Sequence, residues 1–305
     1  MLSLHTNNAA LSAQNSISRT QSSLSTSMTR LSTGYRINSA MDDAAGLQIA
    51  TRLKTQTSGM GVAMRNTQNS ISMLQTAEGA LDETTNILNR MKDLATQAAD
   101  GSSTGVDQQA MQAEFDSLSN ELGNIMSNTK FGGTALLNSD AAKGKLSTAV
   151  TFQIGSDMDE KMNADFTVEL GKVHSDILLA AKQYDGGTGA AAAAAGTEIS
   201  DNAATPNSVT GANNANATIK TLATAIDSVA ALRSKIGAVS NRLDHVYNNL
   251  SNISTNTKNA TGRIMDVDFA SESASMTSNQ MLLQAGTAML KQSNSQSSLV
   301  LSLLQ

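Results

Sequence analysis

A long stretch from Asp42 to Asp100 repeats its apolar side chains every seven residues, and this repeat constrains the fold more than any other feature. Two rows of the repeat are Leu74, Leu81, Leu88 and Ala95, and Met64 and Ile71. Such spacing predicts an α-helix with one apolar face. At 1.5 Å per residue the helix would be roughly 90 Å long, so it cannot bury that face against itself. The sequence therefore predicts a bundle in which other helices pack along this one.

Two further segments have the spacing of partner helices. The breaker from Asp100 to Gly105 ends the long stretch, and apolar residues then recur at steps of four and three: Met111, Phe115, Leu118, Leu122 and Ile125. This second helix is expected to fold back antiparallel. From Ile219 onward a seven-residue row returns, consisting of Leu222, Val229, Ile236, Leu243 and Leu250. It predicts a third long helix beside the first.

The two ends of the chain carry similar, sparsely filled apolar rows. The N-terminal row is Leu4, Leu11, Ile17, Leu24 and Leu31, and the C-terminal row is Met276, Leu283, Leu290 and Leu304. The intervening residues are mostly Ser, Thr, Asn and Gln, whose helix propensity is modest, so each end alone is a marginal helix. We expect the ends to be disordered in the monomer and to pair as a coiled coil when they find a partner.

The middle of the chain changes character. Residues 149–155 and 164–171 alternate apolar and polar side chains, which predicts a β-hairpin over 149–171. Residues 186–217 are low in complexity and are expected to build little core, within a reduced variable region that spans 172–217. The predicted fold is mainly α: a long antiparallel helical hairpin of coiled-coil type with a small β-hairpin. Its domains are a terminal coiled coil, 1–44 with 266–305, and a helical bundle, 45–265.

Composition excludes several classes of function. Of 305 residues 40% are hydrophobic but only 3% are aromatic, which favours helix seams over a thick globular core. The net charge of -5 is spread along the chain without a basic patch, so nucleic-acid binding is not expected. No apolar run is long enough to predict membrane insertion. The N-terminus lacks a signal-peptide pattern, and by that rule alone the chain would be cytosolic.

The sequence offers no recognisable catalytic, cofactor or metal site. Cysteine is absent, and His5, His174 and His245 are too scattered for a ligand pair. The glycine-rich run 186–189 has no following lysine, so it predicts a flexible loop and not a phosphate site. Asp42 and Asp43 stand where a helix begins and are interpreted as capping residues. We therefore expect a protein that is not an enzyme and needs no cofactor.

Long runs at both ends resemble bacterial flagellin. They are LSTGYRINSAMDDAAGLQIATRL from Leu31 to Leu53, ESASMTSNQ from Glu272 to Gln280, QAGTAML from Gln284 to Leu290, and VLSLL from Val300 to Leu304. The likeness covers roughly 1–172 and 218–305, and leaves the middle as a reduced variable region. The sequence from Leu31 to Ile37, with Thr33 and Tyr35, is more similar to lateral-type flagellins than to polar ones.

This resemblance implies a subunit of the extracellular flagellar filament, with the paired ends as the inner layer of a hollow polymer. It also implies export through the flagellar secretion channel, which explains the missing signal peptide, and partners in the export apparatus, an export chaperone, the filament cap and the hook-junction proteins. The run LNRMKDLATQ from Leu88 to Gln97 is similar to the segment that the flagellin-sensing Toll-like receptor binds, with Arg90, Leu94 and Glu114 at matching positions. The alternative interpretation of the same surface is structural: in a filament it would be buried between neighbouring subunits.

Three other readings stay open from the sequence. A hook–filament junction protein of the same superfamily is the nearest alternative, although the run from Asn38 to Gly46 favours the filament type. A soluble receptor-binding effector would need Arg90 exposed in its working form. An enzyme within residues 140–217 is the least favoured, because that segment has one histidine and no catalytic motif.

Overall fold

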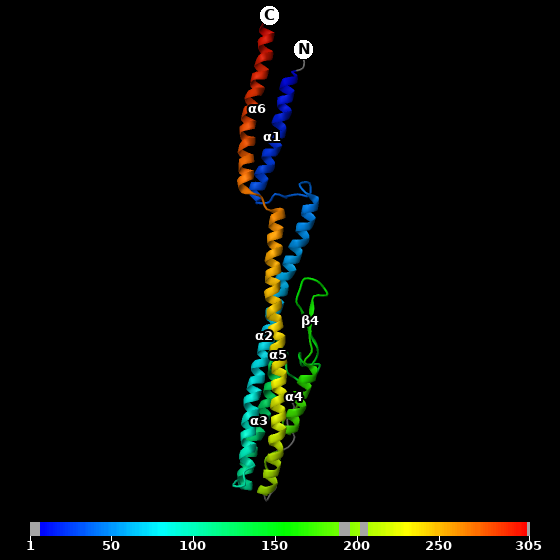
Figure 1. The fold of residues 1–305 in the computed structure, drawn as a ribbon, viewed down its shortest axis with the longest axis vertical. Helices are drawn as coiled ribbons and strands as arrows, with labels where there is room; N and C mark the ends of the chain where they lie inside the picture. The colour runs from blue at the N-terminus through cyan, green and yellow to red at the C-terminus, as the bar shows by residue number, and fades with distance from the viewer. Residues whose placement is uncertain (1–6, 189–195, 202–206, 304–305) are drawn as a thin grey trace. The chain divides into compact units, whose positions relative to one another are not determined.

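The computed structural model describes residues 7–188, 196–201 and 207–303. Six helices and two pairs of short strands run through these residues (Figure 1). The elements are α1 (Asn8–Thr33), α2 (Ala44–Ala98), α3 (Gly105–Asn128), β1 (Lys130–Phe131), β2 (Thr134–Ala135), β3 (Val150–Gln153), β4 (Lys161–Ala164), α4 (Thr167–Ala180), α5 (Ser208–Met265) and α6 (Phe269–Leu303). The predicted fold class, long helices with a small β-hairpin, is confirmed.

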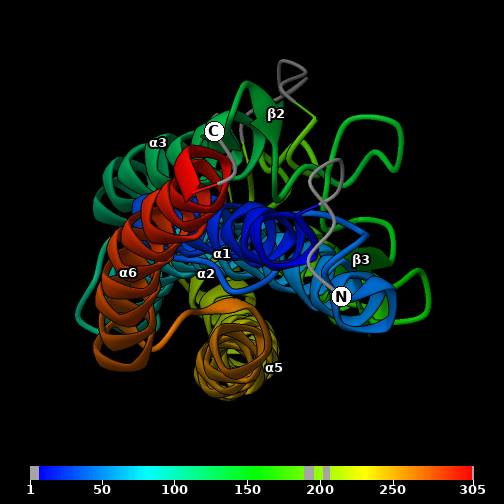
Figure 2. The same ribbon diagram turned by 90° about the horizontal axis from the view of Figure 1, so that it is seen from above.

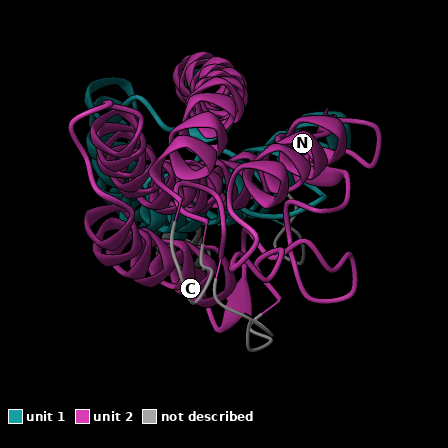
Figure 3. Ribbon diagram, turned by 90° about the horizontal axis from the view of Figure 1, so that it is seen from below, with its two compact units in different colours: residues 1–58, 253–305 teal, residues 59–252 magenta. Residues whose placement is uncertain are grey.

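The chain divides into two compact units, which Figure 3 colours separately. Unit 1 comprises residues 1–58 and 253–305, and unit 2 comprises residues 59–252. Helices α2 and α5 each contribute residues to both units. The boundaries predicted at residues 44 and 266 fall near the ends of these helices and remain a prediction about domains.

Unit 2 holds the main apolar core. The row Leu74, Leu81, Leu88 and Ala95 of α2 is fully buried there, together with Phe115 and Leu122 of α3 and Leu222, Val229 and Leu243 of α5. Around this core Arg233 of α5 forms ion pairs with Asp82 at 2.9 Å and Glu78 at 3.5 Å. The seven-residue repeat thus identifies the buried face of each long helix, because burial and helical period select the same side.

A capping box and a pair of glycines determine two turns of unit 2. Thr104 and Asp107 form a capping box at the start of α3, in which each side chain accepts a hydrogen bond from the other residue's backbone N–H. Gly132 and Gly133 connect β1 to β2 with φ of 58° and 85°, a conformation that glycine adopts without strain. Both turns let the chain reverse direction at the ends of α3.

The middle of the chain differs from its prediction. A hairpin is present, with β3 paired antiparallel to β4 in the register Val150↔Ala164 and Gln153↔Lys161. The expected second strand over 164–171 was wrong, because Thr167–Ala180 forms helix α4. Its buried residues are Leu170, Val173, His174, Ile177 and Ala180, a helical spacing of three and four. Tertiary burial of this face outweighs the short alternating run Phe166, Val168, Leu170.

The expectation that 186–217 builds little core was also wrong for the described part. Ile199 and Ala215 are both buried in unit 2. The alanine run 190–195 and Pro206 lie outside the described residues. Small apolar anchors separated by polar residues are enough to fasten this segment, and a count of its overall composition does not detect them.

His174 is part of a buried polar pair in this region. Its Nε2 lies 2.8 Å from the carbonyl oxygen of Leu137. A carbonyl can only accept, so Nε2 carries the proton and Nδ1 is free to accept from the Tyr184 hydroxyl, with which it is hydrogen bonded. The two rings stack with centroids 5.9 Å apart. Burial lowers the pKa of His174, against the smaller opposing effects of the Leu137 carbonyl and Asp185.

This pair predicts an acid-sensitive stability for unit 2. A histidine whose pKa is lowered on folding stabilises the protein fully above its unfolded pKa of about 6.5, and the stabilisation is lost as the pH falls below that value. Urea unfolding between pH 7.5 and pH 5 is expected to show this loss, with a slope of at most about 1.4 kcal/mol per pH unit from one proton. His174→Gln should flatten the slope, whereas the exposed-site control His245→Gln should keep it. An unchanged slope in His174→Gln would contradict the assignment.

Candidate assembly surface

Helices α1 and α6 pack side by side in unit 1 and run antiparallel (Figures 1 and 2). At one end of the pair the Asn7 side-chain amide donates to the carbonyl and hydroxyl oxygens of Ser293, at 3.3 and 3.2 Å. At the other end Arg30 forms an ion pair with Glu272 at 3.8 Å. The two ends of the chain therefore pair with each other in the described structure.

The turns that adjoin this helix pair are joined through their main chains. Gly34, with φ of 75°, caps the C-terminus of α1, and its carbonyl oxygen accepts from the Val267 N–H at 3.0 Å. The Arg36 N–H donates to the Met265 carbonyl oxygen at 2.6 Å, and Tyr35 pairs with Asp266 as an antiparallel bridge. The turn after α1 and the turn after α5 thus form one hydrogen-bonded junction within unit 1.

Asp42 and Asp43 accept hydrogen bonds in two different turns. Asp43 accepts from the Gly46 N–H at 2.8 Å, which confirms that it caps the first turn of α2. Asp42 instead closes the preceding turn by accepting from the N–H groups of Asn38 at 3.0 Å and Ser39 at 2.9 Å. These backbone N–H groups hold the pKa of Asp42 below its ordinary value. Both carboxylates are used structurally.

The predicted seam residues lie along the α1–α6 pair but are poorly covered. Those at half-buried positions are Ile17, Leu24, Leu31, Met276, Leu283 and Leu290. Leu11 is 59% exposed, and Leu4 and Leu304 lie outside the described residues. The one buried residue of α1 is Ser27. A single chain therefore leaves this seam incomplete, in contrast to the closed core of unit 2.

A second apolar row on α6 escaped the sequence analysis. Met281, Leu282 and Met289 are 60%, 56% and 68% exposed. They occupy positions seven and eight residues apart, so they lie on one side of the helix, away from the row of Leu283 and Leu290 that faces α1. The signal was present in the sequence, but the seven-residue row that includes Leu283 concealed it. Exposed apolar rows of this kind mark surfaces that other molecules cover.

One glycine permits the close approach of α1 and α6. A Cβ atom added at Gly286 would lie 2.9 Å from Cγ1 of Ile17, closer than side chains tolerate. The helix therefore bears glycine where the apolar side chain of the other helix enters. This contact places the Ile17 side chain against α6.

The predicted receptor residues are divided between surface and core. Arg90 of α2 donates through Nε and Nη2 to Glu114 Oε1 of α3, at 3.0 and 2.7 Å, and both side chains are about half exposed. Leu94 is only 2% exposed and belongs to the core of unit 2. The structure brings Arg90 and Glu114 together, whereas Leu94 could meet a receptor only by leaving the core.

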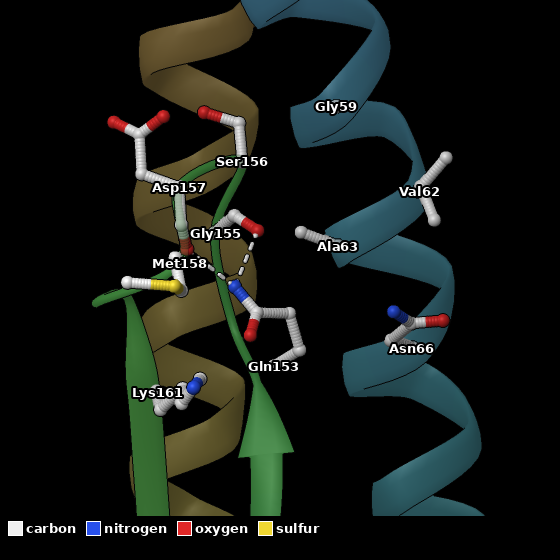
Figure 4. A pocket seen from close by; sticks show the side chains of 10 residues that line it. All are labelled: Gly59, Val62, Ala63, Asn66, Gln153, Gly155, Ser156, Asp157, Met158 and Lys161. Carbon is white, nitrogen blue, oxygen red and sulfur yellow. Dashed lines mark hydrogen bonds between the residues drawn. The ribbon is translucent and has the colours of Figure 1, made fainter.

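A cleft of about 540 Å³ lies between the β3–β4 turn and α2 (Figure 4). Its lining includes Val62 and Ala63 on the helix side and Met158 and Lys161 on the hairpin side. The Gln153 side-chain amide is already used, since it donates to the carbonyl oxygens of the turn residues Gly155 and Asp157 at 3.1 and 2.6 Å. These contacts stabilise the turn that borders the cleft.

Among the described residues, no three His, Asp or Glu side chains are grouped closely enough to hold a metal ion. No helix in the described part of the chain is both long and apolar enough to cross a membrane. The α1–α6 pair, by contrast, leaves apolar side chains exposed in the single chain.

Fold and surface together define a class: helical proteins whose two ends pair and present apolar rows to further copies or partners. Residues 4–142 match the bacterial flagellin N-terminal helical region, and residues 219–304 match the bacterial flagellin C-terminal helical region. These two matches cover most of the chain. The chain belongs to the bacterial flagellin family.

Individual relatives agree with this assignment. Flagellin C of Vibrio cholerae is 44% identical over 189 residues, which cover 62% of this chain and 48% of the relative. Polar flagellin F of Vibrio parahaemolyticus is 47% identical over 175 residues, which cover 57% of this chain and 44% of the relative. The matched part of the chain thus spans about half the length of these relatives.

The solved structures support the fold. One assigned to a flagellar hook-associated protein from Vibrio parahaemolyticus superimposes with a TM-score of 0.54 at 15% sequence identity, covering 74% of this chain and all of that chain. At this identity the likeness concerns the fold alone. It does not choose between filament and junction proteins.

Proposed function

We propose that this chain is a structural subunit of the bacterial flagellar filament, exported from the cell and polymerised outside it for motility. The observation that carries the proposal is the α1–α6 pair, in which the two ends meet but leave apolar rows exposed. Membership of the flagellin family supports the same function. No catalytic role is part of the proposal.

The apolar side chains that the α1–α6 pair leaves exposed give the chain a reason to polymerise. Helix α1 is rich in Ser and Thr, and its exposed threonines donate to their own helix, as Thr26 does to the Ser22 carbonyl oxygen. Such a helix gains little stability by itself. Additional copies would bury Leu11, Met281 and Met289, so the free energy of assembly would also stabilise the terminal helices.

The other partners belong to the same proposal. Family membership favours export through the flagellar apparatus with a chaperone, and contact with the filament cap and hook-junction proteins. The exposed Arg90–Glu114 pair is the part of the surface available to a host Toll-like receptor in the unassembled chain. In a filament, neighbouring subunits would compete for that surface.

The proposal predicts that assembly needs both ends of the chain. Seeded polymerisation would compare the intact chain with chains lacking Leu2–Ser32 or Ser273–Gln305, using electron microscopy and far-UV circular dichroism. Only the intact chain should extend seeds into long filaments, with helicity rising on assembly. A matching thermal transition of unit 2 in all three chains is the control for folding.

Other outcomes identify the alternative. Growth that stops after a short zone on hook-type seeds would indicate a junction protein. Long filaments formed equally well by the trimmed chains would contradict a role for the α1–α6 pair in assembly.

A further inference from the structure

Helices α3 and α5 hold a five-residue segment of main chain, Gly196–Ser200, which we call the strap. On the α3 side, Gln112 Oε1 accepts from the Ile199 N–H at 2.8 Å, and Asp116 accepts from the Gly196 N–H at 3.1 Å. These two acceptors lie one helical turn apart, and both accept from backbone N–H groups of the strap.

The α5 side supplies donors to the same strap. The Asn214 amide donates to the carbonyl oxygens of Thr197 and Ser200, each at 3.1 Å. The Thr218 hydroxyl donates to the carbonyl oxygen of Glu198 at 2.7 Å. Acceptors on α3 therefore bind N–H groups of the strap, and donors on α5 bind its carbonyl oxygens.

Two strap side chains add specificity. Ile199 is fully buried in the core of unit 2. The buried carboxylate of Glu198 accepts from the Lys182 N–H at 2.6 Å and from the Gln112 side-chain amide at 2.9 Å. The strap is thus held by main-chain hydrogen bonds, one apolar anchor and one acidic anchor, which is how proteins bind short extended peptides.

The first position of the strap is crowded by the ends of three side chains. A Cβ atom at Gly196 would lie 2.0 Å from Glu198 Oε2 and 2.7 Å from both Asp116 Oδ1 and Gln112 Nε2. The last position is different, because the buried Ser200 hydroxyl has no hydrogen-bond partner among the described residues. A side chain at the start of the strap would have to displace the ends of the Glu198, Asp116 and Gln112 side chains, whereas the terminal hydroxyl is dispensable.

We propose that α3 and α5 form a peptide-binding site for a short extended peptide of the pattern Gly-x-Glu-Ile-x, and that the strap is this ligand bound in cis. The strap can then leave the site without unfolding the core of unit 2. Its departure exposes Gln112, Asn214 and Thr218, whose polar groups favour the return of the strap or the entry of the same peptide from solution.

The test uses the full chain with the strap weakened by Ile199→Asp, which puts a charge where the apolar anchor was. The probe is a fluorescent, N-acetylated and C-amidated peptide Gly-Thr-Glu-Ile-Ser, and binding is followed by fluorescence anisotropy. Saturable binding to the variant, at least tenfold tighter than to the natural chain with its competing strap, is expected.

Three matched peptides separate the contributions. An N-methylated isoleucine cannot donate to Gln112 and should weaken binding at least tenfold. Alanine in place of the first glycine should weaken binding, and alanine in place of the last serine should leave it unchanged. Equal binding of the N-methylated peptide, or none to a variant with natural circular dichroism and cooperative melting, would overturn the proposal.

A second measurement applies to the natural chain and does not depend on the folding of Ile199→Asp. Hydrogen exchange should be faster at the Gly196 and Ile199 amides than at the Leu88 amide of the core, and excess peptide should accelerate it by capturing the open site. Strap amides that exchange only with the core, at a rate the peptide does not change, would show that the strap is inseparable from the fold and would refute the inference.

Discussion

Serine substituted together at Met281, Leu282 and Met289 will leave the chain folded and suppress polymerisation. All three side chains are more than half exposed in the single chain, so their loss costs the monomer little. In the polymer each would bury its remaining apolar area, a loss of about 3 kcal/mol for the three, which corresponds to roughly a hundredfold in the assembly constant. The critical concentration for growth on seeds, measured by sedimentation of filaments, should rise accordingly.

A matched control comes from the same turns of α6. Gln280→Ser with Gln284→Ser changes neighbouring exposed positions to the same residue without removing apolar area, so its critical concentration should stay near that of the natural chain. If the triple variant polymerises as well as this control, the α6 row is not an assembly surface, and the seam with α1 would have to supply the contacts.

Leu88→Ala will destabilise unit 2 by about 2–5 kcal/mol, because it removes a fully buried side chain from a close-packed core. Leu88 belongs to the row on α2 that faces α3 and α5 within this unit. The loss is a large share of the total stability of an ordinary domain, of order 5–15 kcal/mol. Urea denaturation followed by circular dichroism should show the midpoint falling.

Leu179→Ala is the corresponding control on the surface. Leu179 of α4 is 70% exposed, so the same change of residue type should alter the free energy of unfolding by no more than about 0.5 kcal/mol. Equal losses at the two positions would mean that the Leu88 side chain is not closely packed. An intermediate loss at Leu88 would indicate that α2 relaxes into the cavity.

The long helices could be predicted because their burial is periodic. Leu74, Leu81 and Leu88 repeat every seven residues and are fully buried, so sequence spacing and packing give the same face. The pairing of the two ends was also predictable from their similar, sparse rows. Where the chain folds by helical periodicity, one row of apolar residues identifies both the element and its buried side.

The middle of the chain could not be predicted in the same way. Phe166, Val168 and Leu170 are spaced as in a strand, yet Val168 is exposed at the start of α4. The helix forms because it buries a larger apolar face, which includes Leu170 and Ile177. The strap is fastened through its backbone, and backbone hydrogen bonds leave almost no trace in residue identity. On α6, the row of Leu283 and Leu290 belongs to the repeat that runs through the C-terminal segment, and this repeat concealed the exposed row of Met281, Leu282 and Met289.

The junction of Gly34–Arg36 with Met265–Val267 has a consequence for how these turns can vary. Most of its ties join backbone groups, so most side chains there can change without breaking a bond. The exceptions are Gly34, which is restricted by its positive φ, and Arg36, whose side chain donates to the Ile264 carbonyl oxygen at 2.9 Å. Inserting or deleting one residue is another matter, since it would shift donors away from acceptors on the opposite segment. These turns should therefore tolerate many amino-acid sequences but only one number of residues.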